Sequence, residues 1–229
     1  MQILAGGRDA DVFGYGDGLV LRRYRDGRSA EAEGVLMRDL ARLGFPVPAV
    51  ESVTGPDLVM ERIDGPTMAT QLLQGDLDPV EGGALLARLH DDLHRLPWPG
   101  GQPLLHLDLH PFNVLMSSRG PVVIDWPNAR TGAPGLDVAM TALILAQVAT
   151  YPEIVADSAL GSAPSDDVTA RLPEQLTALL ASFARSTATP FAPHLDDVEE
   201  LRRSDRYQSE AERARLGDAV ALVRSLAIG

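Results

Sequence analysis

The chain has 229 residues, of which 45% are hydrophobic and 23% are charged, a composition that excludes a disordered or fibrous protein. It contains no cysteine, which excludes disulfides, thiolate metal sites and cysteine nucleophiles. Every one of its 20 basic residues is an arginine, and 32 acidic residues give a net charge of −12, so we expect no nucleic-acid partner.

The N-terminal residues do not form a secretory signal, because no basic segment precedes an apolar one. The most apolar stretch of the chain, residues 139–149, is far shorter than the roughly 20 residues that span a bilayer. We therefore expect a cytoplasmic protein that does not enter a membrane.

The N-terminal part of the sequence has the pattern of a small sheet. Residues 12–15 and 19–22 are apolar runs on either side of a glycine-containing turn, and they predict a hairpin. Residues 57–60 predict another strand, and the segment 63–66 breaks the pattern with glycine and proline. A small N-terminal lobe over residues 1–62 follows.

A helix is predicted over residues 29–43, because apolar residues recur there at helical spacing. Ser29 is placed as its N-terminal cap and Gly44 as the residue that ends it. Residues 45–48 contain two prolines, so an extended segment is expected after the helix. The N-terminal lobe therefore combines strands with one helix.

The rest of the chain, residues 63–229, has mainly helical patterns. Leucines on one face predict a helix over 80–96, which a run rich in proline and glycine ends. Segments rich in small and polar residues, such as 157–169, predict loops. Further helical patterns cover residues 136–151, 173–186 and 196–227.

A second hairpin is predicted from two apolar runs, 114–116 and 122–124, that flank a turn-forming segment. If residue 116 pairs with residue 121, residue 113 lies opposite residue 124. Asn113 and Asp125 then stand side by side at the open end of the hairpin, beside the loop that contains Asp108. Two carboxylates and a carboxamide are oxygen ligands that suit Mg²⁺.

The spacing of these polar residues resembles that of the protein-kinase-like fold, in which a His-x-Asp-x-x-x-x-Asn loop precedes a strand that ends in a metal-binding Asp. With Trp126 after Asp125 and the segment 135–139 further on, the sequence resembles the aminoglycoside phosphotransferase family in particular. The resemblance covers most of residues 3–150.

The resemblance implies a two-lobe α+β fold, with a small antiparallel sheet and a helix in the N-terminal lobe and a larger, mainly helical C-terminal lobe. It also implies an enzyme that uses ATP and Mg²⁺ to move the γ-phosphate to a hydroxyl of a small molecule. GTP in place of ATP is left open.

Matched position by position, the resemblance assigns roles around the His-x-Asp loop. Asp108 would accept or orient the proton of the acceptor hydroxyl, and His106 would brace the loop. Asp137 would anchor the loop backbone from the following helix. Asn113 and Asp125 would hold Mg²⁺ against the nucleotide phosphates.

In the N-terminal lobe, Arg22 stands where the family has a strand lysine that contacts the phosphates, and Glu33 stands at the position of its helix partner. Arginine keeps the charge but replaces a compact ammonium with a planar fork. Val20, two residues earlier on the same strand, faces the same side and would pack on adenine.

Two more nucleotide-binding segments follow from the resemblance. Gly6 and Gly7 would form the turn that covers the phosphates, although the regular Gly-x-Gly-x-x-Gly is missing. The backbone of Met60, Glu61 and Arg62 would hydrogen-bond adenine between the lobes.

The sequence also departs from the family pattern. Leu107 and Phe112 stand where glycine or a small or polar residue is usual, and Pro127 and Asn128 follow Trp126 where an acidic residue is common. These changes bear on the substrate more than on the fold.

Three alternatives remain open. A pseudokinase that binds nucleotide or a partner without transferring phosphate is compatible with Arg22 and the irregular glycine turn. His106, Asp108 and His110 also allow a transition-metal site. The acidic group Asp196, Asp197, Glu199 and Glu200 suits either a helix N-terminus, because of its macrodipole, or a cationic acceptor. The sequence does not predict the acceptor or the oligomeric state.

Overall fold

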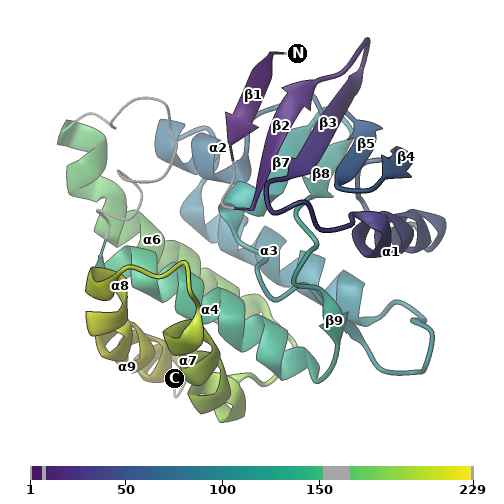
Figure 1. Ribbon diagram of the computed structural model, residues 1–229. Coiled ribbons are helices and arrows are strands. Elements are labelled where there is room, and N and C mark those ends of the chain that lie inside the picture. Colours follow the sequence, from purple (N-terminus) through teal and green to yellow (C-terminus); the bar gives the residue numbers. More distant parts are fainter. Residues whose placement is uncertain (1, 7–8, 152–165, 228–229) are drawn as a thin grey trace. The chain divides into compact units, whose positions relative to one another are not determined.

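The computed structural model describes residues 2–6, 9–151 and 166–227 (Figure 1). The strands are β1 Ile3–Gly6, β2 Ala10–Gly14, β3 Leu19–Tyr24, β4 Val50–Thr54, β5 Asp57–Glu61, β6 Leu104–Leu105, β7 Val114–Ser117, β8 Gly120–Val123 and β9 Arg130–Thr131. The α-helices are α1 Glu31–Arg42, α2 Met68–Gln74, α3 Pro79–His94, α4 Pro134–Thr150, α6 Asp166–Ser186, α7 Leu195–Ser204, α8 Glu210–Ala214 and α9 Leu216–Ala227. Short 3₁₀ helices cover Pro111–Asn113 and Ala192–His194.

Contacts between Cα atoms group the chain into two compact units. Unit 1 contains residues 1–67 and 113–127, and unit 2 contains residues 68–112 and 128–229. The predicted division at residue 62 stays a prediction about domains. Unit 1 is not one continuous N-terminal segment, because it contains both the N-terminal sheet and the later hairpin of β7 and β8.

Backbone hydrogen bonds explain why this hairpin belongs to unit 1. Val123 in β8 donates to the carbonyl of Pro46 at 2.8 Å, and Met116 in β7 donates to the carbonyl of Pro66 at 2.8 Å. The bonded proline carbonyls lie just after α1 and just after the N-terminal sheet in the chain. Unit 1 is therefore built from segments that are distant in sequence.

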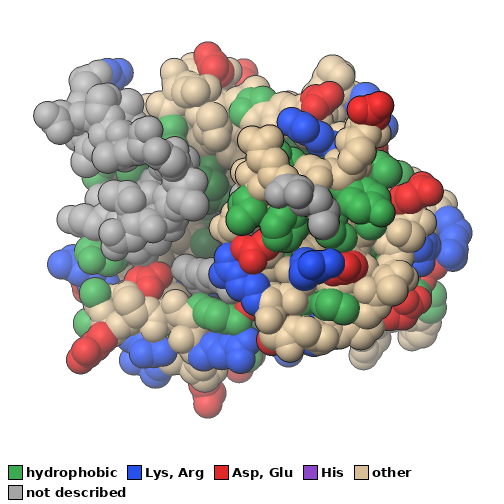
Figure 2. Space-filling view, turned by 45° about the horizontal axis from the view of Figure 1, so that its top comes forward, with side chains coloured by type: hydrophobic (Ala, Val, Ile, Leu, Met, Phe, Trp, Pro, Cys, Tyr) green, Lys and Arg blue, Asp and Glu red, His purple; other side chains and the backbone are tan. Residues whose placement is uncertain are grey.

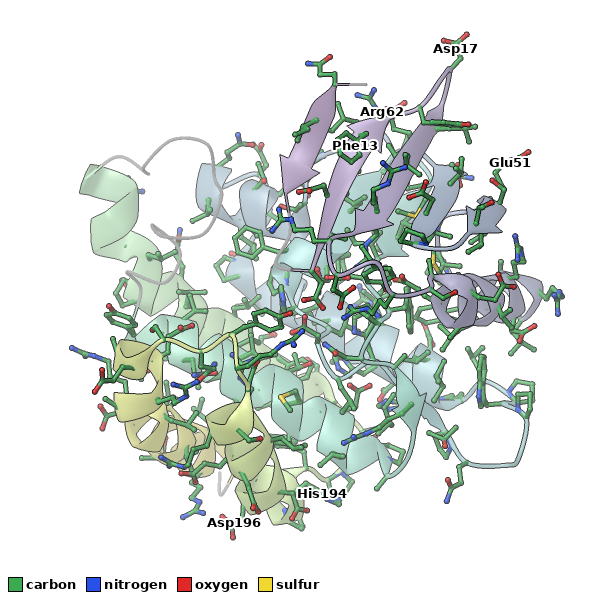
Figure 3. All side chains as sticks on the ribbon, in the orientation of Figure 1. Phe13, Asp17, Glu51, Arg62, His194 and Asp196 are labelled. Carbon is green, nitrogen blue, oxygen red and sulfur yellow. The ribbon has the colours of Figure 1, made fainter. Side chains whose placement is uncertain are left out.

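The sheet of unit 1 is antiparallel, with the strand order β1-β2-β3-β5-β4. The predicted hairpin is β2 and β3, and the strand predicted at 57–60 is β5. Asp17 lies at the tip of the hairpin and points away from the sheet (Figure 3). The edge strands β1 and β4 were not predicted, because they are short and lack a clear alternation of apolar and polar residues.

Helix α1 begins later than predicted. Its N-cap residue is Ala30, without a side-chain cap, and the Ser29 hydroxyl instead accepts from the backbone N–H of Glu31 at 3.2 Å. The predicted stop is confirmed, since Gly44 has a φ of +83°, which glycine adopts without strain. Gly34 lets α1 approach the sheet closely, because a Cβ there would lie 2.5 Å from Cγ2 of Val53.

In unit 2, helix α6 packs against α3 and α4 (Figure 1). Nearly all of α4 is buried, and this explains why its sequence is apolar around the whole circumference. Among the described residues, no helix is long and apolar enough to cross a membrane. On the face shown in Figure 2, acidic and basic side chains are interspersed.

The C-terminal region differs from the prediction. The helical pattern at 196–227 is broken into α7, α8 and α9, because Asp205 is extended and Ser209 starts a new helix through a capping box with Glu212. Helix α2 was not predicted. Of the loop predicted at 157–169, residues 157–165 lie outside the described part, and residues 166–169 are helical in α6.

Candidate active site

Arg22 lies in the middle of β3 and is buried, with 8% of its surface exposed. One guanidinium nitrogen, Nη1, donates to the carboxylate of Glu33 on α1 and to the hydroxyl of Tyr24 at 3.0 Å. The ion pair between Arg22 and Glu33 that the resemblance implied is therefore present in the structure. Burial opposes the charge of Arg22, but its pKa is raised by the negative charges of Glu33 and Asp125.

Glu33 organises unit 1 around Arg22. Its Oε2 also accepts from the Tyr24 hydroxyl at 2.5 Å, and its Oε1 accepts from the backbone N–H of Trp126 at 3.1 Å. Burial, together with the charge of Glu33, raises the pKa of Tyr24 to about 12, so Tyr24 stays protonated at neutral pH. Sequence reasoning missed Tyr24, whose position two residues after Arg22 on the same face of the strand was the available signal.

The same arginine also reaches Asp125, a contact that the sequence did not predict. Nη2 of Arg22 donates to Oδ1 of Asp125 at 2.5 Å. Asp125 follows the strand β8 and has a φ of +70°, a left-handed conformation that is uncommon outside glycine, asparagine and aspartate. Its side chain remains 38% exposed.

Asn113 lies at the start of β7, where the predicted register is confirmed. Met116 pairs with Pro121, and the backbone N–H of Ile124 donates to the carbonyl of Asn113 at 3.0 Å. The backbone of Asn113 is thus next to the residue that precedes Asp125, as the hairpin geometry required.

These two residues fit the ligand preferences of Mg²⁺. A carboxylate and a carboxamide are hard oxygen donors, and Mg²⁺ is commonly held by one or two carboxylates together with substrate phosphates. No group of three or more His, Cys, Asp or Glu residues that could hold a metal ion occurs in the part of the chain that the structure describes. A magnesium ion held by Asn113 and Asp125 would need further oxygen ligands, which phosphates can supply.

Of the predicted adenine-binding residues, Val20 lies on β3, Met60 and Glu61 lie on β5, and Arg62 follows β5. Val20 pairs with Met60 across the two strands, and both side chains are buried. The backbone N–H groups of Glu61 and Arg62 donate to Ala49 at 2.8 Å and to Gly18 at 2.9 Å. The N–H groups of Glu61 and Arg62 are therefore already used within unit 1, and the contact of residues 60–62 with adenine stays a prediction.

The predicted phosphate-covering turn joins β1 and β2. Gly6 ends β1 opposite Asp11, and a Cβ on Gly6 would lie 3.2 Å from Nη2 of Arg25. Gly7 lies outside the described residues. Asp9, just after the turn, is paired with Arg28 at 2.7 Å.

In unit 2, the His-x-Asp loop is held by Asp137 at the start of α4. Asp137 is fully buried, and its carboxylate accepts from the backbone N–H groups of His106 at 2.9 Å and Leu107 at 2.6 Å. Burial alone would raise the pKa of Asp137, but the hydrogen bond from His94 and the charges of His90 and His94 lower it to about 2. Asp137 therefore anchors the loop as a carboxylate.

Leu107, one of the departures from the family pattern, has an unusual backbone conformation. Its φ is +62°, a conformation that costs a non-glycine residue about 1 kcal/mol or more. The hydrogen bond from its N–H to Asp137 offsets that strain. Glycine, one of the residues that the resemblance gives for this position, adopts the same conformation without the cost.

Asp108 follows on the same loop, with 28% of its side chain exposed. Its backbone N–H donates to Nδ1 of the buried His106 at 3.3 Å, and Nε2 of His110 lies 3.5 Å from Oδ1. Burial would raise the pKa of Asp108, but the charge and hydrogen bond of His110, with smaller contributions from His106 and Arg202, hold it below the usual value. Asp108 is therefore ionised at neutral pH.

Thr141, one turn after Asp137 on α4, was missed from the sequence. Its hydroxyl donates to the carbonyl of Leu109 at 2.8 Å, and Nε2 of His90 lies 3.0 Å from the same hydroxyl oxygen. His90 has no exposed surface and supports the loop through Thr141. The signal for Thr141 was its spacing of four residues from Asp137, which places both on one face of the helix.

The acidic group at the start of α7 is largely paired within unit 2. Asp196 pairs with Arg224 at 2.5 Å and Glu199 with Arg203 at 2.6 Å, while Asp197 lies 3.7 Å from His194. Figure 3 shows His194 and Asp196 at this end of the helix. These pairs favour the interpretation of a charged helix terminus, and a cationic acceptor stays a prediction.

Asp108 belongs to unit 2, whereas Asn113 and Asp125 belong to unit 1. Their convergence on one site therefore stays a prediction.

A small antiparallel sheet with a helix and a buried arginine–glutamate pair, followed by a mainly helical unit, defines the two-lobe protein-kinase-like fold class, as predicted. The sequence matches the phosphotransferase enzyme family (APH) over residues 1–104 and 97–158, so the chain belongs to that family. This membership supports a phosphotransferase that acts on small molecules.

Solved structures agree on the fold. The ADP-bound aminoglycoside phosphotransferase APH(2'')-Ib is 15% identical, with a TM-score of 0.56 over 99% of this chain and 93% of its own. A choline/ethanolamine kinase family protein from Mesorhizobium loti is 16% identical, with a TM-score of 0.58 over 100% and 92% of the two chains.

An amicoumacin kinase in complex with AMP-PNP, Ca²⁺ and Ami is 16% identical, with a TM-score of 0.52 over 98% of this chain and 87% of its own. No curated protein sequence matches the chain. At these identities the likenesses show the fold alone.

Proposed function

We propose that this protein transfers the γ-phosphoryl group of ATP, with Mg²⁺, to a hydroxyl group of a small molecule. The observation that carries the proposal is the Asp108 loop. An ionised, partly exposed carboxylate stands on a backbone that a fully buried carboxylate, Asp137, holds in place. Phosphoryl transfer needs such a positioned acceptor for the hydroxyl proton more than it needs a covalent intermediate.

In this mechanism Asp108 orients the acceptor hydroxyl and takes up its proton as the hydroxyl oxygen bonds to the γ-phosphorus. The bond between that phosphorus and the β,γ-bridging oxygen breaks, and ADP leaves. His106 braces the loop from the interior. Asn113 and Asp125 would hold Mg²⁺, which when bound neutralises the charge of the phosphates. Arg22, fixed by Glu33, would contribute a positive charge next to the same phosphates.

The remaining nucleotide contacts come from unit 1. Val20 and the backbone of residues 60–62 would receive adenine, and the turn with Gly6 and Gly7 would cover the phosphates. The similar structures include an aminoglycoside phosphotransferase and a choline/ethanolamine kinase family protein. An amino sugar or amino alcohol is therefore the first class of acceptor to test.

The test is a single-turnover transfer assay with Mg²⁺ and γ-labelled ATP or GTP against a panel of aminoglycosides, sugars and amino alcohols. We expect labelled product with the wild type. Asp108→Asn should reduce transfer by about 10²-fold or more, because the general base is lost, and Asp125→Ala should reduce it similarly. Asp92→Asn, which changes an exposed acidic residue of α3, is the matched control and should transfer normally.

A pseudokinase predicts a different pattern. Nucleotide would bind, but the wild type, Asp108→Asn and Asp125→Ala would show the same background hydrolysis and no transfer to any acceptor. The intact Asp108, Asn113 and Asp125 favour the enzyme over this second candidate.

A further inference from the structure

The contact between Arg22 and Asp125, which the sequence did not predict, supports an inference about how strongly nucleotide binding depends on Mg²⁺. It rests on the proposed function, because it concerns the nucleotide and the metal. Within unit 1 the two terminal nitrogens of Arg22 bind different carboxylates: Nη1 binds Glu33, and Nη2 binds Oδ1 of Asp125 at 2.5 Å. Tyr24 adds a hydrogen bond to Nη1 at 3.0 Å and so fixes the plane of the guanidinium.

Arg22 thus forms a bridge between Glu33 and Asp125, and this bridge requires an arginine side chain. A guanidinium is a planar fork whose two ends can bind two carboxylates at once, whereas the ammonium of lysine is a compact point charge. The chain contains no lysine at all. A lysine at position 22 could keep the pair with Glu33, but it would leave Asp125 without its cationic neighbour.

The charges of Arg22, Glu33 and Asp125, which form one cluster, show how the bridge affects the binding of phosphates. Arg22 contributes +1, and Glu33 and Asp125 contribute −1 each, so the three side chains sum to −1. Without the bridge to Arg22, the full charge of Asp125 would face incoming phosphates. Repulsion between like charges in a partly buried site is strong, because the effective dielectric constant is low. A bound divalent cation removes that repulsion, and a resident guanidinium reduces it.

We propose that Arg22 is the resident counter-ion of Asp125 and that it thereby lowers the dependence of nucleotide binding on Mg²⁺. The arginine contacts Oδ1, while the second carboxylate oxygen and the carboxamide of Asn113 supply the oxygen donors for the metal. Arg22 and Mg²⁺ then share one carboxylate.

The experiment compares the affinity for AMP-PNP and GMP-PNP, measured by isothermal titration calorimetry in Mg²⁺ and in EDTA. The quantity of interest is the ratio of the dissociation constant without metal to that with metal. Arg22→Lys should raise this ratio about tenfold over the wild type. The matched control is Arg23→Lys on the same strand, whose guanidinium pairs with Asp57 outside this cluster, and its ratio should equal that of the wild type.

Two further variants test the physical cause. Arg22→Gln removes the charge altogether and should also raise the ratio. When Asp125→Asn is introduced first, Arg22→Lys should no longer change the ratio, because the repelling charge is gone. Thermal unfolding of each variant shows that it is folded before it is titrated.

The outcomes separate the two proposals. If the wild type binds nucleotide and both Arg22 variants keep its ratio, Arg22 is not the counter-ion and this inference alone is wrong. If neither the wild type nor any variant binds AMP-PNP or GMP-PNP, in Mg²⁺ or in EDTA, the proposed function is wrong and this inference is wrong with it.

Discussion

At the scale of single residues, buried charges decide how the loop around Asp108 is held. Asp137 has no exposed surface, yet it keeps a carboxylate because His94 and the N–H groups of His106 and Leu107 all donate to it. Hydrogen bonds to the charged form outweigh the cost of burial. The same residue that positions the loop is therefore sensitive to acid.

The pKa of Asp137 leads to a prediction about pH. Because its pKa in the folded protein, about 2, lies below the ordinary aspartate pKa of 3.8, the Asp137 carboxylate stabilises the fold by about 2 kcal/mol above pH 4. This stabilisation is lost as the pH falls towards 2. Asp137→Asn should be less stable than the wild type at pH 6. The difference should shrink by about 1 kcal/mol at pH 3. Urea unfolding at both pH values measures it.

Asp218→Asn serves as the control for this experiment, since it changes an acidic residue in the first turn of α9. Its free energy of unfolding at pH 6 should stay within about 1 kcal/mol of that of the wild type. A gap between wild type and Asp137→Asn that stays constant from pH 6 to pH 3 would show that Asp137 is not the acid-sensitive group.

At the scale of elements, the sequence predicted those whose patterns are set locally. The β2–β3 hairpin, β5, α3 and the register of β7 with β8 follow from turn residues and apolar periodicity. The edge strands β1 and β4 carry no such pattern, and the breaks between α7, α8 and α9 depend on a capping box inside a helical stretch. The contact of Arg22 with Asp125 joins two residues that are 103 positions apart in the chain, so no local pattern indicates it.

Helix packing in unit 2 gives a prediction at this scale. Gly83 on α3 lies so close to α6 that a Cβ would be 2.4 Å from the carbonyl oxygen of Leu179 and 2.7 Å from the backbone nitrogen of Phe183. Backbone atoms cannot move aside as a flexible side chain can. Gly83→Ala should therefore destabilise the protein by about 1–3 kcal/mol, as overpacking does.

Gly217 on α9 is the matched control, because a Cβ there meets nothing within 4 Å. Gly217→Ala should be neutral or stabilise the protein by up to about 1 kcal/mol, since alanine loses less backbone entropy in a helix. Chemical denaturation of both variants gives the comparison. Equal effects of the two substitutions would contradict the close packing of α3 on α6.

At the scale of the whole molecule, the chain crosses between its two units at residues 67/68, 112/113 and 127/128. Neither unit is a continuous segment, so a single cut at residue 62 would leave the β7–β8 hairpin and Asp125 out of the N-terminal part. The sequence suggested that cut because the change from strand to helical patterns occurs there. Local patterns do not reveal that the later β7–β8 hairpin belongs to the same unit as the first sheet.

Because the chain passes repeatedly between the two units, we can predict whether they unfold together. Because unit 1 is complete only when residue 127 has joined it, the units should unfold together in one calorimetric transition. AMP-PNP with Mg²⁺ at 100 times its dissociation constant should stabilise the fold by about 2.7 kcal/mol and raise the midpoint by roughly 5–10 °C. The whole transition should move, including the helical signal in circular dichroism, to which unit 2 contributes most. A scan with separate transitions, of which the ligand shifts only one, would mean that the units unfold independently in spite of the crossings.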